Sequence, residues 1–177
     1  VPSLTPPNRP IPEVAETALE AKALNKTYGR VGLFENGRMV KAAQDVELIL
    51  RRGETLGVVG ESGSGKSTVA RCMVRLIDPT SGDINVAGTN IAQMAESELR
   101  AYRQKIQIVF QDPYRSLNPR RTVGQSIVEG PMNFGLSGTE AQSRAENLMR
   151  IVGLAPEALT RFPHQFSGGQ RQRICIA

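Results

Sequence analysis

The stretch Gly60-Glu61-Ser62-Gly63-Ser64-Gly65-Lys66-Ser67-Thr68 is the most informative part of this sequence. It fits the pattern G-x-x-x-x-G-K-[ST], which is the phosphate-binding P-loop. Upstream, residues 54–59 (ETLGVV) predict a short buried strand. Downstream, residues 67–77 (STVARCMVRLI) predict a helix. Strand, glycine-rich loop and helix follow one another in the order that the motif requires.

The residue types of this loop explain why it would bind a polyphosphate. Glycines allow positive φ and a close approach of the backbone, so that successive N–H groups form a concave nest. The following helix adds its positive N-terminal end. Lys66 would reach the outer phosphates, and the Ser67 hydroxyl would ligate Mg²⁺. The alternative is a glycine- and serine-rich turn that contains lysine by chance, and the flanking elements disfavour it. The predicted nucleotide-contacting residues are Gly60, Glu61, Ser62, Gly63, Ser64, Gly65, Lys66, Ser67 and Thr68.

Composition places the chain among ordinary globular proteins. Its 177 residues are enough for one domain with a real core and a tail. A run of about 18 apolar residues, as a membrane-spanning helix needs, does not occur. The net charge of +5 suits nucleic acid or an anionic membrane slightly, but it also suits a nucleotide-binding surface, and scattered solvated charge is the favoured interpretation. Cys72 and Cys175 lack metal-ligand spacing, so we expect small buried side chains in a reducing compartment.

The order of the predicted elements indicates an α/β fold. Five prolines before residue 13 predict an extended linker or tail over residues 1–17. Strands are expected at 18–27, 40–50, 84–86 and 106–110, and Val46, Leu48 and Leu50 share one face of the second. Helices are expected at 97–104, 123–129 and 139–152, and residues 112–121 are expected to be irregular. Helical spacing in the last of these helices groups Ala141, Ala145, Leu148 and Val152. We therefore predict a P-loop α/β core, an antiparallel β region before it and a helical insert after Gln111.

A second motif lies at residues 166–173, Phe-Ser-Gly-Gly-Gln-Arg-Gln-Arg. Ser167 is the predicted N-cap of a last helix that begins near Gly168. Free N–H groups and a hydroxyl at a helix start make a further anion site, and a simple N-cap is an alternative that does not exclude it. Together with the P-loop, this motif resembles the signature motif of ATP-binding-cassette (ABC) ATPases. The resemblance covers about residues 18–177 and implies the P-loop NTPase fold of that family.

The resemblance implies roles for further residues. Tyr28 takes the place of the aromatic that stacks on adenine, with Phe34 as a rival and a half-buried strand-end aromatic as the alternative. Gln111 takes the place of the Q-loop glutamine, which senses the γ-phosphate, shares the Mg²⁺ with Ser67 and couples to a membrane subunit; otherwise it is a surface glutamine. Lys66 and Gln111 are therefore the expected catalytic residues. The residues expected to cap the γ-phosphate of ATP on a second ATPase domain are Ser167, Gly168, Gly169 and Gln170.

Residues 111–120, Gln-Asp-Pro-Tyr-Arg-Ser-Leu-Asn-Pro-Arg, resemble the ATPase subunits of dipeptide, oligopeptide and nickel importers. This implies an ATP-binding subunit that powers import of peptides or a similar small solute from the cytoplasmic face of a membrane. The implied partners are a second ABC ATPase domain, transmembrane permease subunits and a solute-binding protein, with no nucleic acid. The alternative is a soluble ABC-type ATPase that acts on DNA or ribosomes, which the positive charge suits slightly.

The sequence departs from the family pattern in one respect. The Walker B aspartate, the catalytic glutamate, the D-loop and the switch histidine have no counterpart within residues 1–177. His164 precedes the signature, so we expect it to pack in a loop or to cap a helix. We therefore expect residues 18–177 to form an incomplete ABC domain, without its C-terminal part, in which 112–167 form the helical subdomain. The 177-residue chain alone is not expected to hydrolyse ATP.

Overall fold

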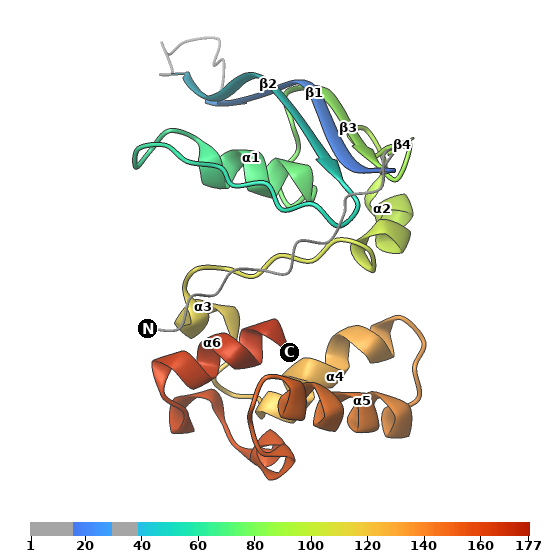
Figure 1. Cartoon of the computed structure of the whole chain (residues 1–177), viewed down its shortest axis with the longest axis vertical. Helices are drawn as coiled ribbons and strands as arrows, with labels where there is room; N and C mark the ends of the chain where they lie inside the picture. Colours follow the sequence, from blue (N-terminus) through green and yellow to red (C-terminus); the bar gives the residue numbers. More distant parts are fainter. Residues whose placement is uncertain (1–15, 30–38) are drawn as a thin grey trace. The chain divides into compact units, whose positions relative to one another are not determined.

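The computed structural model of the chain describes residues 16–29 and 39–177 (Figure 1). It consists of two compact units that divide between Ile106 and Gln107, and each is described by itself. The predicted proline-rich segment lies outside the described residues, apart from its last two, and so does Phe34. Within the described residues, no helix is long and apolar enough to cross a bilayer.

The first unit contains the predicted antiparallel β region (Figure 1). Its four strands lie in the order β2-β1-β3-β4, and every neighbouring pair is antiparallel. The alternation predicted for the second strand is confirmed, because Val46, Leu48 and Leu50 are half-buried while residues 47 and 49 are exposed. The strands are β1 (Thr17–Tyr28), β2 (Val40–Arg51), β3 (Ser81–Val86) and β4 (Thr89–Asn90).

A bulge in β1 decides which residues reach the core. Ala21 and Leu24 are both buried although three positions separate them, which a regular strand forbids. The pairing register shifts between them, and Ala23 takes a φ of 45°. Across the bulge, the Asp45 amide of β2 donates a hydrogen bond of 2.9 Å to Asn25 Oδ1. The bulge therefore turns Leu24 onto the core face of the sheet.

Helix α1 (Lys66–Met73) follows the glycine-rich loop and packs its last turn, with Cys72 and Met73, into the core of this unit. It ends earlier than the predicted residue 77. Arg75 has a φ of 52°, and the Leu76 amide donates 2.9 Å to Arg71 O, which closes the helix end. The buried Arg75 side chain stabilises this conformation by donating through Nε to Ile91 O at 2.9 Å. Helix α2 (Glu96–Arg103) adds Leu99 to the same core.

Two of the strands that the sequence predicted are absent from the described structure. Residues 54–59 and 106–110 form no regular secondary structure, and several of their apolar side chains are exposed, with Val59 97% exposed. A strand exists only through ladder hydrogen bonds to a neighbour, and among residues 16–29 and 39–177 no segment pairs with either stretch. Apolar composition alone could not supply that neighbour.

The second unit is helical, and both of its longer predicted helices are confirmed. Residues 112–121 are not wholly irregular, since Pro113 and its neighbours form a short helix that Asp112 caps. In α5 the buried residues are Ala141, Ala145 and Met149, so Met149 is fully buried where the pattern had named Leu148. The helices are α3 (Pro113–Ser116), α4 (Val123–Asn133), α5 (Gly138–Ile151) and α6 (Gly168–Ile176), with 3-10 turns η1 (Pro156–Thr160) and η2 (Pro163–Gln165).

Candidate phosphate-binding sites

The loop before α1 has the backbone geometry that a phosphate cradle needs. Gly63 and Gly65 have φ values of 85° and 90°, which favour glycine strongly. Gly65 is also the N-cap residue of α1. A Cβ atom placed on it would lie 2.0 Å from the Ala42 carbonyl oxygen of β2. The loop therefore rests directly on the sheet at Gly65, and no other residue type fits there.

The amides of this loop are open to an anion. No side chain caps α1, whereas most helices have such a cap. The Ser64 amide donates 3.2 Å to Glu61 O, but the amides of Gly65 through Thr68 find no acceptor among the described residues. Several N–H groups at a helix start, together with the helix dipole, form an anion site. The structure thus brings residues 60–68 together as one candidate cradle.

The Lys66 side chain folds back onto this loop and donates hydrogen bonds to it. Its Nζ donates to Gly60 O at 2.7 Å, to Glu61 O at 2.5 Å and to Ser64 Oγ at 3.2 Å. Three donors are all that an ammonium has, so a phosphate oxygen would replace one of these acceptors. The ammonium is thereby held over the loop, at the place where the open amides begin. Ser67 is exposed, so its hydroxyl is accessible to a metal ion.

Tyr28 lies at the end of β1 and is 40% exposed. The Lys26 ammonium lies 5.1 Å from the ring centroid and also donates to Asp78 O at 2.8 Å. One face of the ring therefore already carries a cation, which leaves the other face for a base. Stacking on adenine stays a prediction.

Gln111 is exposed and precedes α3 instead of ending a strand. Next to it, Asp112 Oδ1 accepts a hydrogen bond of 2.9 Å from the Tyr114 amide and so fixes the start of α3. Arg115 is 91% exposed in its side chain and lies 3.6 Å from the Asp112 carboxylate. Gln111 belongs to the second unit and Ser67 to the first, so their joint binding of a metal stays a prediction.

The second glycine-rich helix start is organised differently. Ser167 is the N-cap of α6, as predicted, and it forms a reciprocal capping box with Gln170. The Gln170 amide donates to Ser167 Oγ at 3.3 Å, and the Ser167 amide donates to Gln170 Oε1 at 3.0 Å. The amides of Gly168 and Gly169 have no acceptor among the described residues. Two amides and the Ser167 hydroxyl proton are therefore available to an anion.

His164 lies in the 3-10 turn η2, just before α6, and is exposed. Its ring stacks on Phe162 with centroids 5.8 Å apart. Cys72 is buried and Cys175 is half-buried, and burial raises the pKa of both thiols. Within the residues that the structure describes, no group of three His, Cys, Asp or Glu side chains could hold a metal ion.

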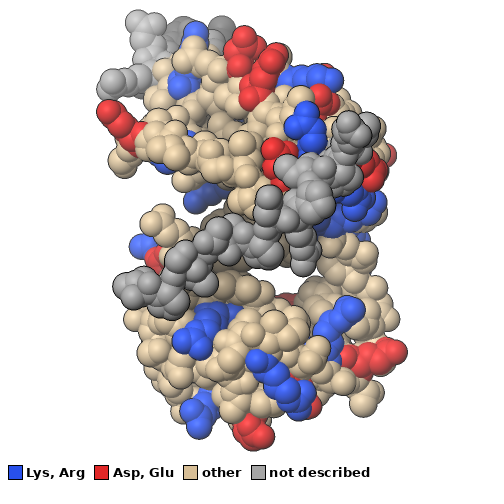
Figure 2. Space-filling view, viewed as in Figure 1, with Lys and Arg blue, Asp and Glu red and all other residues tan. Residues whose placement is uncertain are grey.

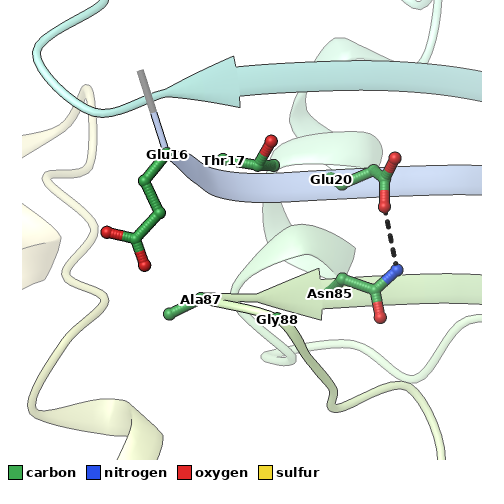
Figure 3. Close-up of a pocket in the computed structure, with 6 residues that line it drawn as sticks. All are labelled: Glu16, Thr17, Glu20, Asn85, Ala87 and Gly88. Carbon is green, nitrogen blue, oxygen red and sulfur yellow. Dashed lines mark hydrogen bonds between the residues drawn. The ribbon is translucent and has the colours of Figure 1, made fainter. Parts of the chain in front are cut away.

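A cavity of about 420 Å³ lies in the first unit beside the start of β1 and the end of β3, and it is not the predicted site (Figure 3). Its carboxylates already have partners: Glu20 Oε2 accepts from Asn85 Nδ2 at 3.1 Å, and Glu16 lies 2.8 Å from Arg52. Two carboxylates would repel a phosphate. None of the residues predicted to bind nucleotide lines this cavity.

The charges on the face seen in Figure 2 are mixed. Lysine and arginine side chains are interspersed with aspartate and glutamate on that face. A nucleic-acid surface typically shows a continuous basic stripe. This face has no such stripe among the residues drawn in colour.

Comparison with known proteins defines the family. Residues 43–177 match the ABC transporter family. The chain is also similar to a solved ATP-binding cassette, MJ0796, in a dimeric post-hydrolysis state bound to ADP and Pi, with 30% identity and a TM-score of 0.77 over 89% of this chain and 67% of that one. The chain therefore belongs to the ABC transporter family, and the predicted fold class is confirmed.

Two curated relatives refine the resemblance. A probable peptide ABC transporter ATP-binding protein, y4tS, of Sinorhizobium fredii is 51% identical over 93% of this chain and 47% of its own length. An oligopeptide transport ATP-binding protein, AppF, of Bacillus subtilis is 48% identical over 92% of this chain and 50% of its own length. The chain thus spans about half the length of these relatives.

Proposed function

We propose that this chain is the nucleotide-binding part of an ATPase subunit that powers import of peptides or a similar small solute through a membrane ABC transporter. The names of the relatives, which are peptide and oligopeptide transport ATP-binding proteins, support the class of solute. They favour import over a soluble ATPase that acts on DNA or ribosomes.

The observation that carries the proposal is the open helix start of α1. Positive-φ glycines, amides without acceptors and the Lys66 ammonium converge on one loop. A triphosphate presents several negative oxygens to such a loop, so the amides of Gly65 through Thr68 would hold them. In this proposal Lys66 exchanges a loop carbonyl for a phosphate oxygen, and Ser67 offers its hydroxyl to Mg²⁺. Bound ATP would supply the phosphoryl group whose transfer to water drives the transport cycle.

The start of α6 would serve a second copy or a related ABC domain. Its two open amides and the Ser167 hydroxyl fit a phosphate that another cradle already holds, so the nucleotide would lie between two domains. The dimeric state of the similar cassette MJ0796 supports this arrangement. Gln111 would report the state of the bound phosphate, and Tyr28 would stack on adenine.

The segment after Gln111 would face transmembrane permease subunits. Tyr114 is 63% exposed and Arg115 is still more exposed, and neither is needed for the core of the second unit. Exposed aromatic and arginine side chains are enriched in protein interfaces. A solute-binding protein would complete the importer, and the subunit would be peripheral to the inner face of the membrane.

Titration with a fluorescent ATP analogue tests the proposal. Lys66→Ala should weaken Mg²⁺–ATP binding by about tenfold or more, since a charge-assisted hydrogen bond contributes about 1.5–3 kcal/mol. Lys105→Ala removes a lysine of the same unit whose Nζ lies over Tyr102, 5.5 Å from its centroid, and should leave the affinity unchanged. Equal affinities in folded Lys66→Ala and parent protein would refute the P-loop assignment.

A further inference from the structure

Sequence patterns did not reveal one contact in the second unit, between α3 and α6. The Arg171 guanidinium lies over the Tyr114 ring, with Cζ 4.1 Å from the ring centroid. This distance is well inside the range of a cation–π interaction. Tyr114 belongs to α3, directly after Gln111, and Arg171 belongs to the first turns of α6.

The same arginine also holds the chain that leads into α6. Its Nε donates to Phe166 O at 3.0 Å, and one Nη donates to His164 O at 3.4 Å. Phe166 directly precedes the Ser167 cap, and His164 lies three residues before it. The planar guanidinium of Arg171, on α6, therefore contacts both the Tyr114 ring of α3 and the residues that lead into α6.

Tyr114 also lies beside the open amides. A Cβ atom placed on Gly168 would be 3.9 Å from the Tyr114 hydroxyl oxygen, which is ordinary contact distance. The hydroxyl end of the Tyr114 ring therefore lies close to Gly168, one of the two glycines whose amides have no acceptor among the described residues.

We propose that Tyr114 and Arg171 form a clamp that positions the amides of Gly168 and Gly169 relative to α3, and that Arg171 does not itself bind phosphate. This rests on the proposed function, in which those amides meet a nucleotide phosphate. The physical reason is that the guanidinium is already engaged with two carbonyls and a ring. A lysine in its place could not lie flat on the ring while donating to both carbonyls.

Hydrogen exchange of the polypeptide of residues 1–177 tests the clamp directly. The amides of residues 170 and 171 both donate to Ser167, at 3.3 Å and 2.9 Å, so their protection reports how firmly the start of α6 is held. Arg171→Gln and Tyr114→Leu should each speed exchange at residues 170 and 171 by about tenfold, because the start of α6 loses its contacts with α3. Arg171→Lys should behave like Arg171→Gln, whereas Tyr114→Phe keeps the ring and should match the parent. Unchanged exchange in α5 shows that the unit stays folded.

A fluorescence experiment tests whether Arg171 stacks on the residue at position 114, separately from any general loss of packing. The sequence has no tryptophan, so Tyr114→Trp places a single tryptophan under Arg171, and its emission can be excited apart from that of the tyrosines. Adding Arg171→Gln should raise quenching of this tryptophan by acrylamide about twofold, since one face of the indole becomes uncovered. Equal quenching with and without Arg171 would overturn the stacked arrangement.

Nucleotide affinity distinguishes a positioning role of Arg171 from direct binding of phosphate. Arg171→Gln should leave affinity for the fluorescent ATP analogue within about twofold of the parent, since the cradle at residues 60–68 is intact. A large loss of affinity that Arg171→Lys restores would make Arg171 a phosphate ligand and overturn the proposal. So would parent-like exchange at residues 170 and 171 in both Arg171→Gln and Tyr114→Leu. If the parent binds no ATP, the proposed function fails, and the exchange data still decide whether the clamp exists.

Discussion

The two glycine-rich helix starts of this protein differ in how their amides are satisfied. Helix α1 begins at Gly65, with a left-handed N-cap and no side-chain cap, and four successive amides from Gly65 onward find no acceptor in the described part of the chain. Helix α6 begins after Ser167 with a complete capping box, and among residues 16–29 and 39–177 the amides of Gly168 and Gly169 find no acceptor. The amides of the first start are left to water or a ligand, whereas two polar groups of the second start are satisfied by its own capping box.

This difference suggests a division of labour under the proposed function. An open nest with a lysine at its centre can bind a polyphosphate alone. A capped helix start with two free amides offers too few donors for that, but it can complement a phosphate that is held elsewhere. The α1 start would therefore set the affinity for nucleotide, and the α6 start would respond to it.

The largest expected effect is at Gly65. Gly65→Ala should destabilise the first unit by about 3 kcal/mol, because left-handed strain adds to overlap with the Ala42 carbonyl. Urea unfolding followed by circular dichroism measures this change. Gly63→Ala is the matched control: it has similar φ but nothing within 4 Å, so only strain of about 1–2 kcal/mol should remain. Equal losses in the two variants would mean that the loop does not rest on β2.

The capping difference predicts a smaller effect. Ser167→Ala should destabilise α6 by about 1 kcal/mol, since it removes the acceptor for the Gln170 amide. Ser67→Ala near the start of α1 removes no cap and should change stability by only a few tenths of a kcal/mol. Hydrogen exchange resolved by helix measures both. A comparable loss of protection in α1 for Ser67→Ala would show that α1 does have a side-chain cap.

Arg115→Glu should have the smallest effect on the nucleotide. The side chain is 91% exposed and its ion pair with Asp112 is long, so stability should change by about 1 kcal/mol at most. Affinity for the ATP analogue should stay within about twofold of the parent. Assembly with permease subunits should weaken, as measured by copurification from membranes. A variant that loses ATP binding yet assembles normally would contradict the proposed place of this segment.

Much of both candidate sites could be predicted from the sequence because their interactions are local. Lys66 finds its acceptors on Gly60, Glu61 and Ser64, all within six residues of it. The capping box joins Ser167 to Gln170, three residues apart. When the partners are close in sequence, residue type and spacing nearly determine the hydrogen bonds.

The features that only the tertiary structure decided depend on distant partners. Residues 54–59 and 106–110 have the composition of strands, but strands require a neighbour, and the described residues provide none. The clamp joins Tyr114 of α3 to Arg171 of α6, which are separated in the sequence by α4, α5, η1 and η2, and no spacing rule relates the two. The bulge that turns Leu24 inward needs Asp45 of the facing strand. Strand pairing and cation–π contacts depend on which segments meet in space. Because those segments are distant in the sequence, the whole fold decides the contacts, and residue types at a few neighbouring positions do not predict them.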